Sequence, residues 1–174
     1  MTNPANTFWL TGLSGAGKST IAVALREKFV AANRPCVLLD GDVVRTGLCA
    51  DLDFSPAGRA ENIRRVAHVC RLFNDTGVIA VVALISPAAE DRRIAREIIG
   101  TPNFLEIHIA TTLEVCESRD PKGLYSKARA GTIKEFTGIS APYETPLAPT
   151  CRVDTAHASV AECVAMLYPL ASAY

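Results

Sequence analysis

The 174-residue sequence has no apolar run that approaches the roughly 20 residues needed to span a bilayer, and no excess of either charge. Lysine plus arginine number 18, and aspartate plus glutamate also number 18. That balance predicts no general attraction to nucleic acid or to an anionic membrane, so any anion site must come from a local cluster. Residues 1–7 lack the basic and long apolar segments of a signal peptide. We therefore expect a cytoplasmic protein with no membrane or nucleic-acid partner.

Paired cysteines are also lacking. The six cysteines are scattered, without a C-x-x-C pair or the spacing of a zinc site. The three histidines show no metal-like spacing either. Free, buried thiols of a cytosolic protein are the expected state. A redox pair stays open, because residues that meet only in the folded chain cannot be recognised in the sequence.

Short apolar segments alternate with segments of helical period along a chain whose length predicts one domain, residues 1–174. The expected strands are 8–10, 37–39, 78–84, 104–109 and 152–154. The expected helices are 19–33, 59–74, 90–99, 113–119 and 159–167, and 46–55 is expected to be a loop. This alternation predicts an α/β fold, a mostly parallel sheet of about five strands with helices on both faces.

The most informative stretch is Gly12–Ser19, which fits G-x-x-x-x-G-K-[ST] at every fixed position. A strand-like run precedes it and a helical segment follows, which is the context of a phosphate-binding loop rather than of a simple connecting turn. Glycines let the backbone N–H groups point inward, and the helix adds the positive end of its dipole. Lys18 is expected to reach the β- and γ-phosphates of ATP, and Ser19 to bind Mg²⁺.

Two carboxylates, Asp40 and Asp42, follow the second expected strand and flank a glycine. Ligands of parallel sheets bind beyond the carboxyl ends of the strands, which places both aspartates beside the phosphate loop. There they can orient the waters of Mg²⁺ or take a proton from an acceptor hydroxyl. The alternative is a helix cap or an Asx-turn, which aspartate favours at strand ends. We favour the site, and the cap remains a competitor.

Several arginines surround the next loop and helix. Arg59 and Asn62 lie about one helical turn apart and so share a helix face. A guanidinium group matches phosphate and sulfate oxygens in a bidentate manner, which favours a ligand role for Arg59 and makes Arg45 a candidate. For Arg64 and Arg65, ion pairs on a solvated surface are at least as good an explanation.

The region from about 120 to 150 is rich in glycine, proline and charge, and it follows a short helix. Its cations predict a lid that closes over a transferring group and excludes water, and the alternative is an exposed basic loop. Phe54 and Phe136 lie in loop-like stretches. Two rings from two loops can sandwich a nucleobase, although each ring alone is more often simply packed.

These motifs follow one another in a recognisable order. They are Gly12–Thr20, Asp40–Asp42, Arg45 with Gly47–Leu48, Arg59 with Glu61–Arg65, Ile85–Pro87, Cys116–Glu117, Arg119–Tyr125, Lys127–Gly131, Phe136–Ile139 and Pro142–Glu144. From about residue 7 to the last helix, the sequence resembles the adenylylsulfate kinase (APS kinase) family. The phosphate loop is shared by many enzymes, whereas the run 119–139 is far more specific.

The resemblance implies a three-layer P-loop NTPase fold, a homodimer, and Mg²⁺-assisted transfer of the ATP γ-phosphate to the 3′-hydroxyl of adenosine 5′-phosphosulfate (APS). The implied ATP site comprises Gly12, Leu13, Ser14, Gly15, Ala16, Gly17, Lys18, Ser19, Thr20 and Arg119. The implied APS site comprises Asp42, Arg45, Phe54, Arg59, Asn62, Ile85, Ser86, Lys122, Leu124, Phe136, Thr137 and Gly138. The implied catalytic residues are Lys18, Asp42 and Ser86, and the implied Mg²⁺ ligands are Ser19 and Asp40.

The serine that matches Ser86 is often described in this family as a phosphoserine intermediate. Nothing near Ser86 in the sequence offers an activating base, and a direct in-line transfer needs only positioning and charge stabilisation. We therefore predict that Ser86 binds the substrate. The sequence departs from the family pattern at Gly58, where aspartate is common, at Asp53, where glycine is usual, and at Ala89, where arginine is frequent.

Two other functions stay open. Another small P-loop kinase, acting on a nucleotide, shikimate or a sugar acid, would share the phosphate loop but has no reason to carry both aromatics and the run 119–139. A P-loop module that hydrolyses or senses nucleotide would yield no phosphorylated acceptor. Product analysis separates the three.

Overall fold

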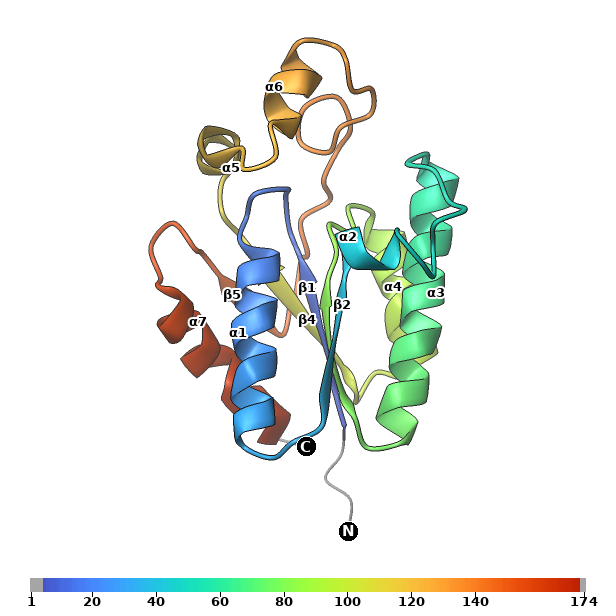
Figure 1. Ribbon diagram of the computed structural model, residues 1–174, viewed down its shortest axis with the longest axis vertical. Coiled ribbons are helices and arrows are strands. Elements are labelled where there is room, and N and C mark those ends of the chain that lie inside the picture. The colour runs from blue at the N-terminus through green and yellow to red at the C-terminus, as the bar shows by residue number, and fades with distance from the viewer. Residues whose placement is uncertain (1–4, 173–174) are drawn as a thin grey trace.

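The computed structural model describes residues 5–172, which form a five-stranded sheet with helices on both faces (Figure 1). The strands are β1 (Thr7–Thr11), β2 (Cys36–Asp40), β3 (Ile79–Ala83), β4 (Phe104–Ile109) and β5 (Cys151–Val153). They lie in the order β2-β3-β1-β4-β5, and every neighbouring pair is parallel. The predicted fold class is confirmed.

The helices form the two outer layers. Helices α1 (Lys18–Ala31) and α7 (Val160–Leu167) cover one face of the sheet, and α3 (Pro56–Asp75) and α4 (Ala89–Ile99) cover the other (Figure 1). The shorter elements are α2 (Gly41–Val44), α5 (Leu113–Arg119), α6 (Leu124–Arg129) and the 3₁₀ helix η1 (Tyr168–Ser172).

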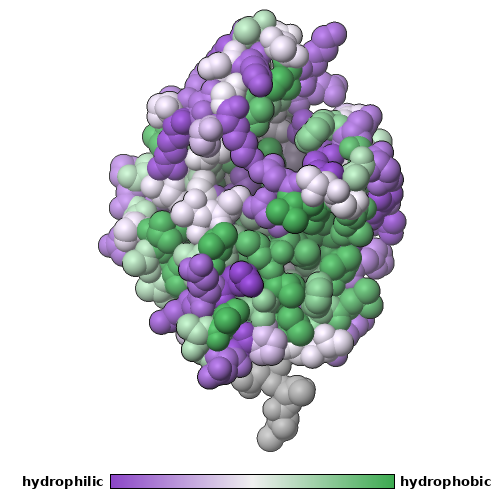
Figure 2. All heavy atoms as spheres, in the orientation of Figure 1, coloured by the Kyte–Doolittle hydropathy of each residue, from purple (hydrophilic) through white to green (hydrophobic). Residues whose placement is uncertain are grey.

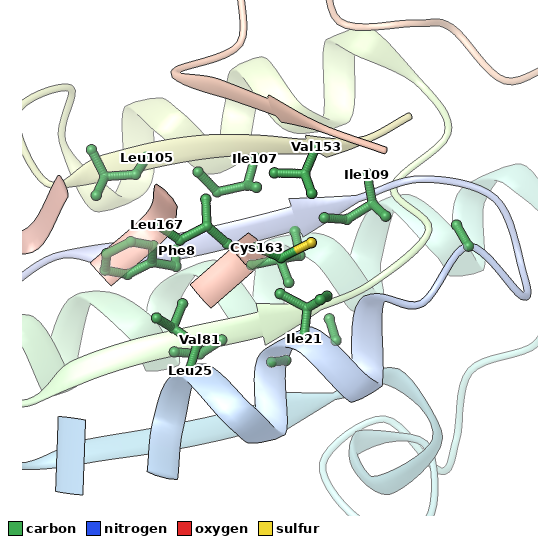
Figure 3. Packing of buried hydrophobic residues seen from close by; sticks show 14 of the residues in the cluster. Phe8, Ile21, Leu25, Val81, Leu105, Ile107, Ile109, Val153, Cys163 and Leu167 are labelled. Atoms are coloured by element: carbon green, nitrogen blue, oxygen red, sulfur yellow. The ribbon is translucent and has the colours of Figure 1, made fainter. Parts of the chain in front are cut away.

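Each face of the sheet carries its own apolar core. Successive strand side chains point to opposite faces, so Phe8 joins the core under α1 and α7 while Trp9 joins the core under α3 and α4. Figure 3 shows the first core, an apolar cluster to which Phe8, Leu25 and Leu167 belong. All four side chains are fully buried, and each such burial stabilises the fold by about 1.5–3 kcal/mol. Burial on both faces explains why the strands are continuously apolar.

The helix ends follow local capping signals. The expected capping box of Ser159 and Glu162 is present at the start of α7. Helix α3 begins at Pro56, three residues before the predicted start, because Ser55 caps it and proline suits the first turn. Helices α2 and α6 were not predicted, since four and six residues are too short to show a helical period.

All five strands end at the same edge of the sheet, and the loops that carry the predicted site residues leave from there. The phosphate loop follows β1, α2 follows β2, and the lid with α6 stands above this edge (Figure 1). Among residues 5–172, no helix is long and apolar enough to cross a membrane. Residues 1–4 and 173–174 lie outside the described residues. They include the ends of the predicted domain 1–174 and part of segment 1–7, for which we predicted no signal peptide.

Candidate active site

The phosphate loop joins β1 to α1 and encloses the Lys18 side chain. Lys18 Nζ donates to the carbonyl oxygens of Gly12 at 2.9 Å and of Leu13 at 2.7 Å. Burial lowers the pKa of Lys18 to about 8, because a buried ammonium loses its hydration. Gly17 has a φ of 100°, and a Cβ at Gly12 would lie 2.5 Å from the Ile109 carbonyl oxygen. The backbone therefore requires glycine at both positions.

Three side chains from later in the chain support the backbone of the phosphate loop. Thr155 Oγ1 donates to the Ala16 carbonyl at 2.7 Å, and Thr111 Oγ1 donates to the same oxygen at 3.2 Å. Arg119 Nη1 donates to the Gly15 carbonyl at 3.3 Å and to Thr155 Oγ1 at 2.8 Å. Arg119 thus contacts the backbone of the phosphate loop. Thr111 and Thr155 were missed, because single threonines in loops carry no motif or periodic signal.

Asp40 caps α2, which was the alternative explanation, and its second oxygen contacts Ser19 of the phosphate loop. Its Oδ2 accepts from Ser19 Oγ at 2.5 Å, and its Oδ1 accepts from the Asp42 backbone N–H at 3.0 Å, which caps α2. Hydroxyl and carboxylate oxygens are the ligands that Mg²⁺ prefers. In the part of the chain that the structure describes, no group of three His, Cys, Asp or Glu side chains could hold a metal. A cation here would therefore complete its shell with phosphate and water, as Mg²⁺ commonly does.

Asp42 and Lys122 meet above the phosphate loop. Asp42 projects from the first turn of α2, and its carboxylate forms an ion pair with Lys122 Nζ of the lid. The two side chains are 71% and 52% exposed. Burial is the main cause of the lowered pKa of Lys18, and the positive charge of Lys122 adds to it. The segment after α5 thus brings a cation to the carboxylate of Asp42.

Arg59 links the start of α3 to the lid. Its Nη1 donates to Thr137 Oγ1 at 2.6 Å, its Nη2 to the Glu135 carbonyl at 2.8 Å, and its Nε to the Phe54 carbonyl at 2.8 Å. The Arg45 guanidinium lies over the Phe54 ring, 4.1 Å from its centroid. Four of the predicted APS contacts, from three segments of the chain, therefore lie close together.

The two rings expected to hold a nucleobase have different surroundings. Phe136 is buried and packs edge-on against Tyr125, with ring centroids 5.0 Å apart. Phe54 is 65% exposed and offers one face opposite Arg45. Among the described residues, the structure records no aromatic pair between Phe54 and Phe136. Phe136 therefore lies in the lid and Phe54 lies just before α3, and the two rings do not stack on each other.

Asn62 carries an unsatisfied acceptor. Its side chain is buried one turn after Arg59, and its Oδ1 has no hydrogen-bond partner within residues 5–172. A buried polar atom without a partner costs about 1–3 kcal/mol, and Asn6 Oδ1 is the other such atom among the described residues.

The phosphate loop and the end of the lid together line an open pocket of about 620 Å³. Leu13 lines one side, and the lid residues from Gly138 to Tyr143 line the other. A Cβ at Gly138 would lie 3.0 Å from a Leu13 methyl group, and its φ is 93°, so glycine permits this close approach. Leu124 is half-buried against the core beneath the lid.

Ser86 lies at the end of β3, beside Ile85. It is 2% exposed, and its φ of 45° is in the left-handed region. Its Oγ accepts from Trp9 Nε1 at 3.0 Å, and the Ile85 carbonyl accepts from Thr11 Oγ1 at 2.6 Å. No carboxylate, imidazole or amine of the described chain hydrogen-bonds to the Ser86 hydroxyl.

The surface explanation holds for Arg64 and Arg65. Both form ion pairs with Glu61, at 2.7 and 2.9 Å, and Arg65 also pairs with Asp51 at 2.7 Å. The two arginines thus belong to one ion-pair network on the surface of α3.

A family model described as Adenylylsulphate kinase matches residues 4–154. The chain is 55% identical over 157 residues to the adenylyl-sulfate kinase of Marinobacter nauticus, which covers 90% of this chain and 79% of that protein. The adenylyl-sulfate kinase of Shewanella pealeana is 53% identical over 160 residues, 92% of this chain and 78% of that protein.

Solved structures agree with the sequence relatives. The Mycobacterium tuberculosis APS kinase CysC in complex with AMPPNP and APS matches with a TM-score of 0.94 and 44% identity, over 98% of this chain and 99% of that chain. A gluconokinase from Sinorhizobium meliloti matches over 99% of this chain and 94% of that chain with a TM-score of 0.58 and 16% identity, which shows a shared fold alone. With the family model and its relatives spanning most of the sequence, the chain belongs to the adenylylsulphate kinase family.

Proposed function

We propose that the chain transfers the γ-phosphate of ATP to the 3′-hydroxyl of APS, which gives 3′-phosphoadenosine 5′-phosphosulfate (PAPS) and ADP. The observation that carries the proposal is the convergence of Lys18, Asp42 and Lys122 at the mouth of the phosphate loop. Phosphoryl transfer needs positioning and charge stabilisation more than covalent chemistry, and these three groups supply both.

On the ATP side, the protonated Lys18 exchanges the carbonyl oxygens of Gly12 and Leu13 for the β- and γ-phosphates. Arg119, fixed by Thr155, lies against the nucleotide base. Ser19 and Asp40 would hold Mg²⁺ through their oxygens, and the ion would neutralise phosphate charge when bound. Their 2.5 Å hydrogen bond supports this role, because it brings the two oxygens side by side.

On the APS side, Arg45 and Arg59 bind the phosphosulfate, because guanidinium groups pair with such oxyanions. The exposed face of Phe54 stacks on the adenine. Asn62 Oδ1 accepts from a substrate hydroxyl, which would satisfy its buried acceptor. Asp42 orients the 3′-hydroxyl and accepts its proton.

The lid and the loop after β3 enclose the acceptor. Lys122 moves from Asp42 to the transferring phosphoryl group, and residues 136–138 close over the substrate with Leu124 beneath them. Ile85 and Ser86 line the sugar side. Ser86 has no base to activate its hydroxyl, which supports direct in-line transfer from ATP to APS.

The test is a coupled assay of ADP release with ATP, Mg²⁺ and APS. We expect release with APS, none with 3′-deoxy-APS, and a loss of at least about a hundredfold in Lys18→Ala. Lys28→Ala is the matched control, since Lys28 is an exposed lysine at the far end of α1. ADP release that ignores APS would overturn the proposal, and release with gluconate or shikimate would support another small kinase.

We further propose that the enzyme is a cytoplasmic homodimer. The six cysteines are free thiols, which suits a reducing compartment. Figure 2 shows apolar side chains gathered on the face where β2 passes in front of the sheet. The half-exposed strand residues Val37 and Leu38 lie there, beside Val43, which is 68% exposed. Such a surface on an edge strand favours an interface.

Light scattering tests the assembly. We expect a mass of two chains, and dissociation to one chain in Val43→Glu. Leu147→Glu, at a fully exposed leucine, is the matched control and keeps the dimer. A hexameric APS kinase from Thiobacillus denitrificans is among the structural neighbours, with a TM-score of 0.74 and 32% identity over 98% of this chain and 29% of that chain. A mass of six chains would contradict the homodimer.

A further inference from the structure

The guanidinium of Arg92 lies inside the protein, beneath the loop that follows β3. Arg92 belongs to α4 and is 3% exposed. Its Nη1 donates to the carbonyl oxygens of Ser86 at 2.6 Å and Pro87 at 3.1 Å, and its Nη2 donates to the Glu144 carbonyl at 2.6 Å. One side chain thus joins the loop after β3 to the segment in which the lid returns to the sheet.

A buried carboxylate orients this guanidinium. Arg92 Nε donates to Glu106 Oε1 at 2.8 Å, and Glu106 of β4 is 6% exposed. The other carboxylate oxygen, Oε2, accepts from Arg96 Nη2 at 2.7 Å. The ion pair neutralises the buried charge and leaves both Nη groups of Arg92 facing the two loop segments.

The loop that Arg92 holds is strained. Ser86 has a φ of 45°, a conformation that costs a residue with a side chain free energy and persists only when its surroundings enforce it. The Ser86 carbonyl accepts from Arg92 and, at 3.4 Å, from Thr11 Oγ1. The charged hydrogen bond from Arg92 therefore helps to hold Ser86 in this conformation.

The lid segment docks on the same loop. Glu144 N donates to the Pro87 carbonyl at 2.9 Å, and Glu144 Oε2 accepts from the Ala89 N–H at 2.6 Å. The hydroxyl groups of Tyr143 and Thr11 are 2.9 Å apart. The returning lid and the loop after β3 thus form one assembly next to the phosphate loop.

We propose that Arg92 is a positioning residue for the acceptor site, because it fixes Ser86 and its loop against the lid segment 143–144. The inference rests on the proposed kinase function and adds a residue that touches neither substrate. Weakening the contact lets the loop and the lid move apart on the acceptor side. The ATP side is held separately, by Thr111, Thr155 and Arg119.

The test compares two arginine-to-lysine variants on α4 that share Glu106 as partner. Arg92→Lys keeps the buried charge but cannot reach three carbonyl oxygens. We expect its KM for APS to rise at least about tenfold while its KM for ATP changes less than about twofold. Amide exchange of residues 143–145 in the free protein should become faster. Arg96→Lys, the matched control, should change none of these.

If Arg92→Lys does not fold, the double variant Arg92→Met with Glu106→Gln removes the buried charge pair together and gives the same readouts. An unchanged KM for APS, or equal rises of both KM values, would overturn the proposal. A wild-type protein without APS-dependent ADP release would instead sink the proposed function. In that event, exchange at 143–145 that stays slow in Arg92→Lys would still refute the positioning role.

Discussion

Asp53 fills the space in which a side chain on residue 58 would begin: a Cβ added to Gly58 would lie 2.3 Å from Asp53 Oδ1. That oxygen accepts from Ser55 N at 3.1 Å and from Ser55 Oγ at 2.6 Å. Ser55 Oγ in turn accepts from the Gly58 N–H at 3.1 Å, which caps α3. Two positions at which the sequence departs from the family pattern are therefore neighbours in space and fit each other.

This contact predicts that residues 53 and 58 must change together. Gly58→Asp alone should lower the free energy of unfolding by about 1–3 kcal/mol, because the new side chain collides with Asp53. Adding Asp53→Gly removes the collision with Oδ1 but leaves the carbonyl oxygen of residue 53, 2.6 Å from the added Cβ. It should therefore restore only part of that loss, with a coupling energy of about 0.5–3 kcal/mol in a double-mutant cycle measured by urea unfolding. Strictly additive effects of the two substitutions would show that the contact has no energetic weight.

Asp42→Asn should separate chemistry from folding. The substitution removes the proton acceptor while Asp40, which caps α2, remains. We expect kcat to fall by about 10²- to 10⁴-fold with little change in Tm, because exposed ion pairs such as Asp42–Lys122 contribute little to stability. Asp75→Asn removes another aspartate that is more than half exposed and pairs with Arg71, and it serves as the control. Unchanged turnover would exclude Asp42 as the base.

The phosphate loop and the strand segments around it could be predicted because their signals are local. Gly12–Ser19 is one contiguous motif, and the buried strands are contiguous apolar runs. Arg92 and Thr155 could not be predicted, because their roles depend on carbonyl oxygens that only the fold brings near them. The relation between Asp53 and Gly58 was equally hidden, since two separate departures gave no sign of a shared contact.

Lys18 predicts a pH dependence of ATP capture. Burial lowers its pKa to about 8, and the amine must be protonated to bind phosphate. The charged form is complete well below pH 8 and is lost above it, so kcat/KM for ATP should fall as the pH rises through about 8. In the ATP complex, the negative phosphates raise the pKa of Lys18, so kcat should fall only at higher pH.

The measurement is a pair of pH–rate profiles between pH 6 and 10 (about one point per half unit), with the residual activity at pH 7.5 checked after each exposure. That check separates titration from denaturation. A kcat/KM that stays flat to pH 10 would show that Lys18 remains protonated in the free enzyme, contrary to its burial.

Ser86→Ala distinguishes direct transfer from a phosphoserine intermediate. Without a nucleophilic role, turnover should stay within about tenfold of the wild type, whereas loss of a nucleophile costs many orders of magnitude. The substitution does remove the acceptor of the fully buried Trp9 Nε1, so the free energy of unfolding should fall by about 1–3 kcal/mol. Trp9→Phe removes the donor that Ser86→Ala would leave unpaired. In the Trp9→Phe background, Ser86→Ala should therefore lower the free energy of unfolding by less than it does in the wild type.

Rapid quench with γ-labelled ATP and no APS should leave the protein unlabelled. Label that appears on the wild type and disappears in Ser86→Ala would establish the intermediate, and a base for Ser86 would then have to come from the substrate.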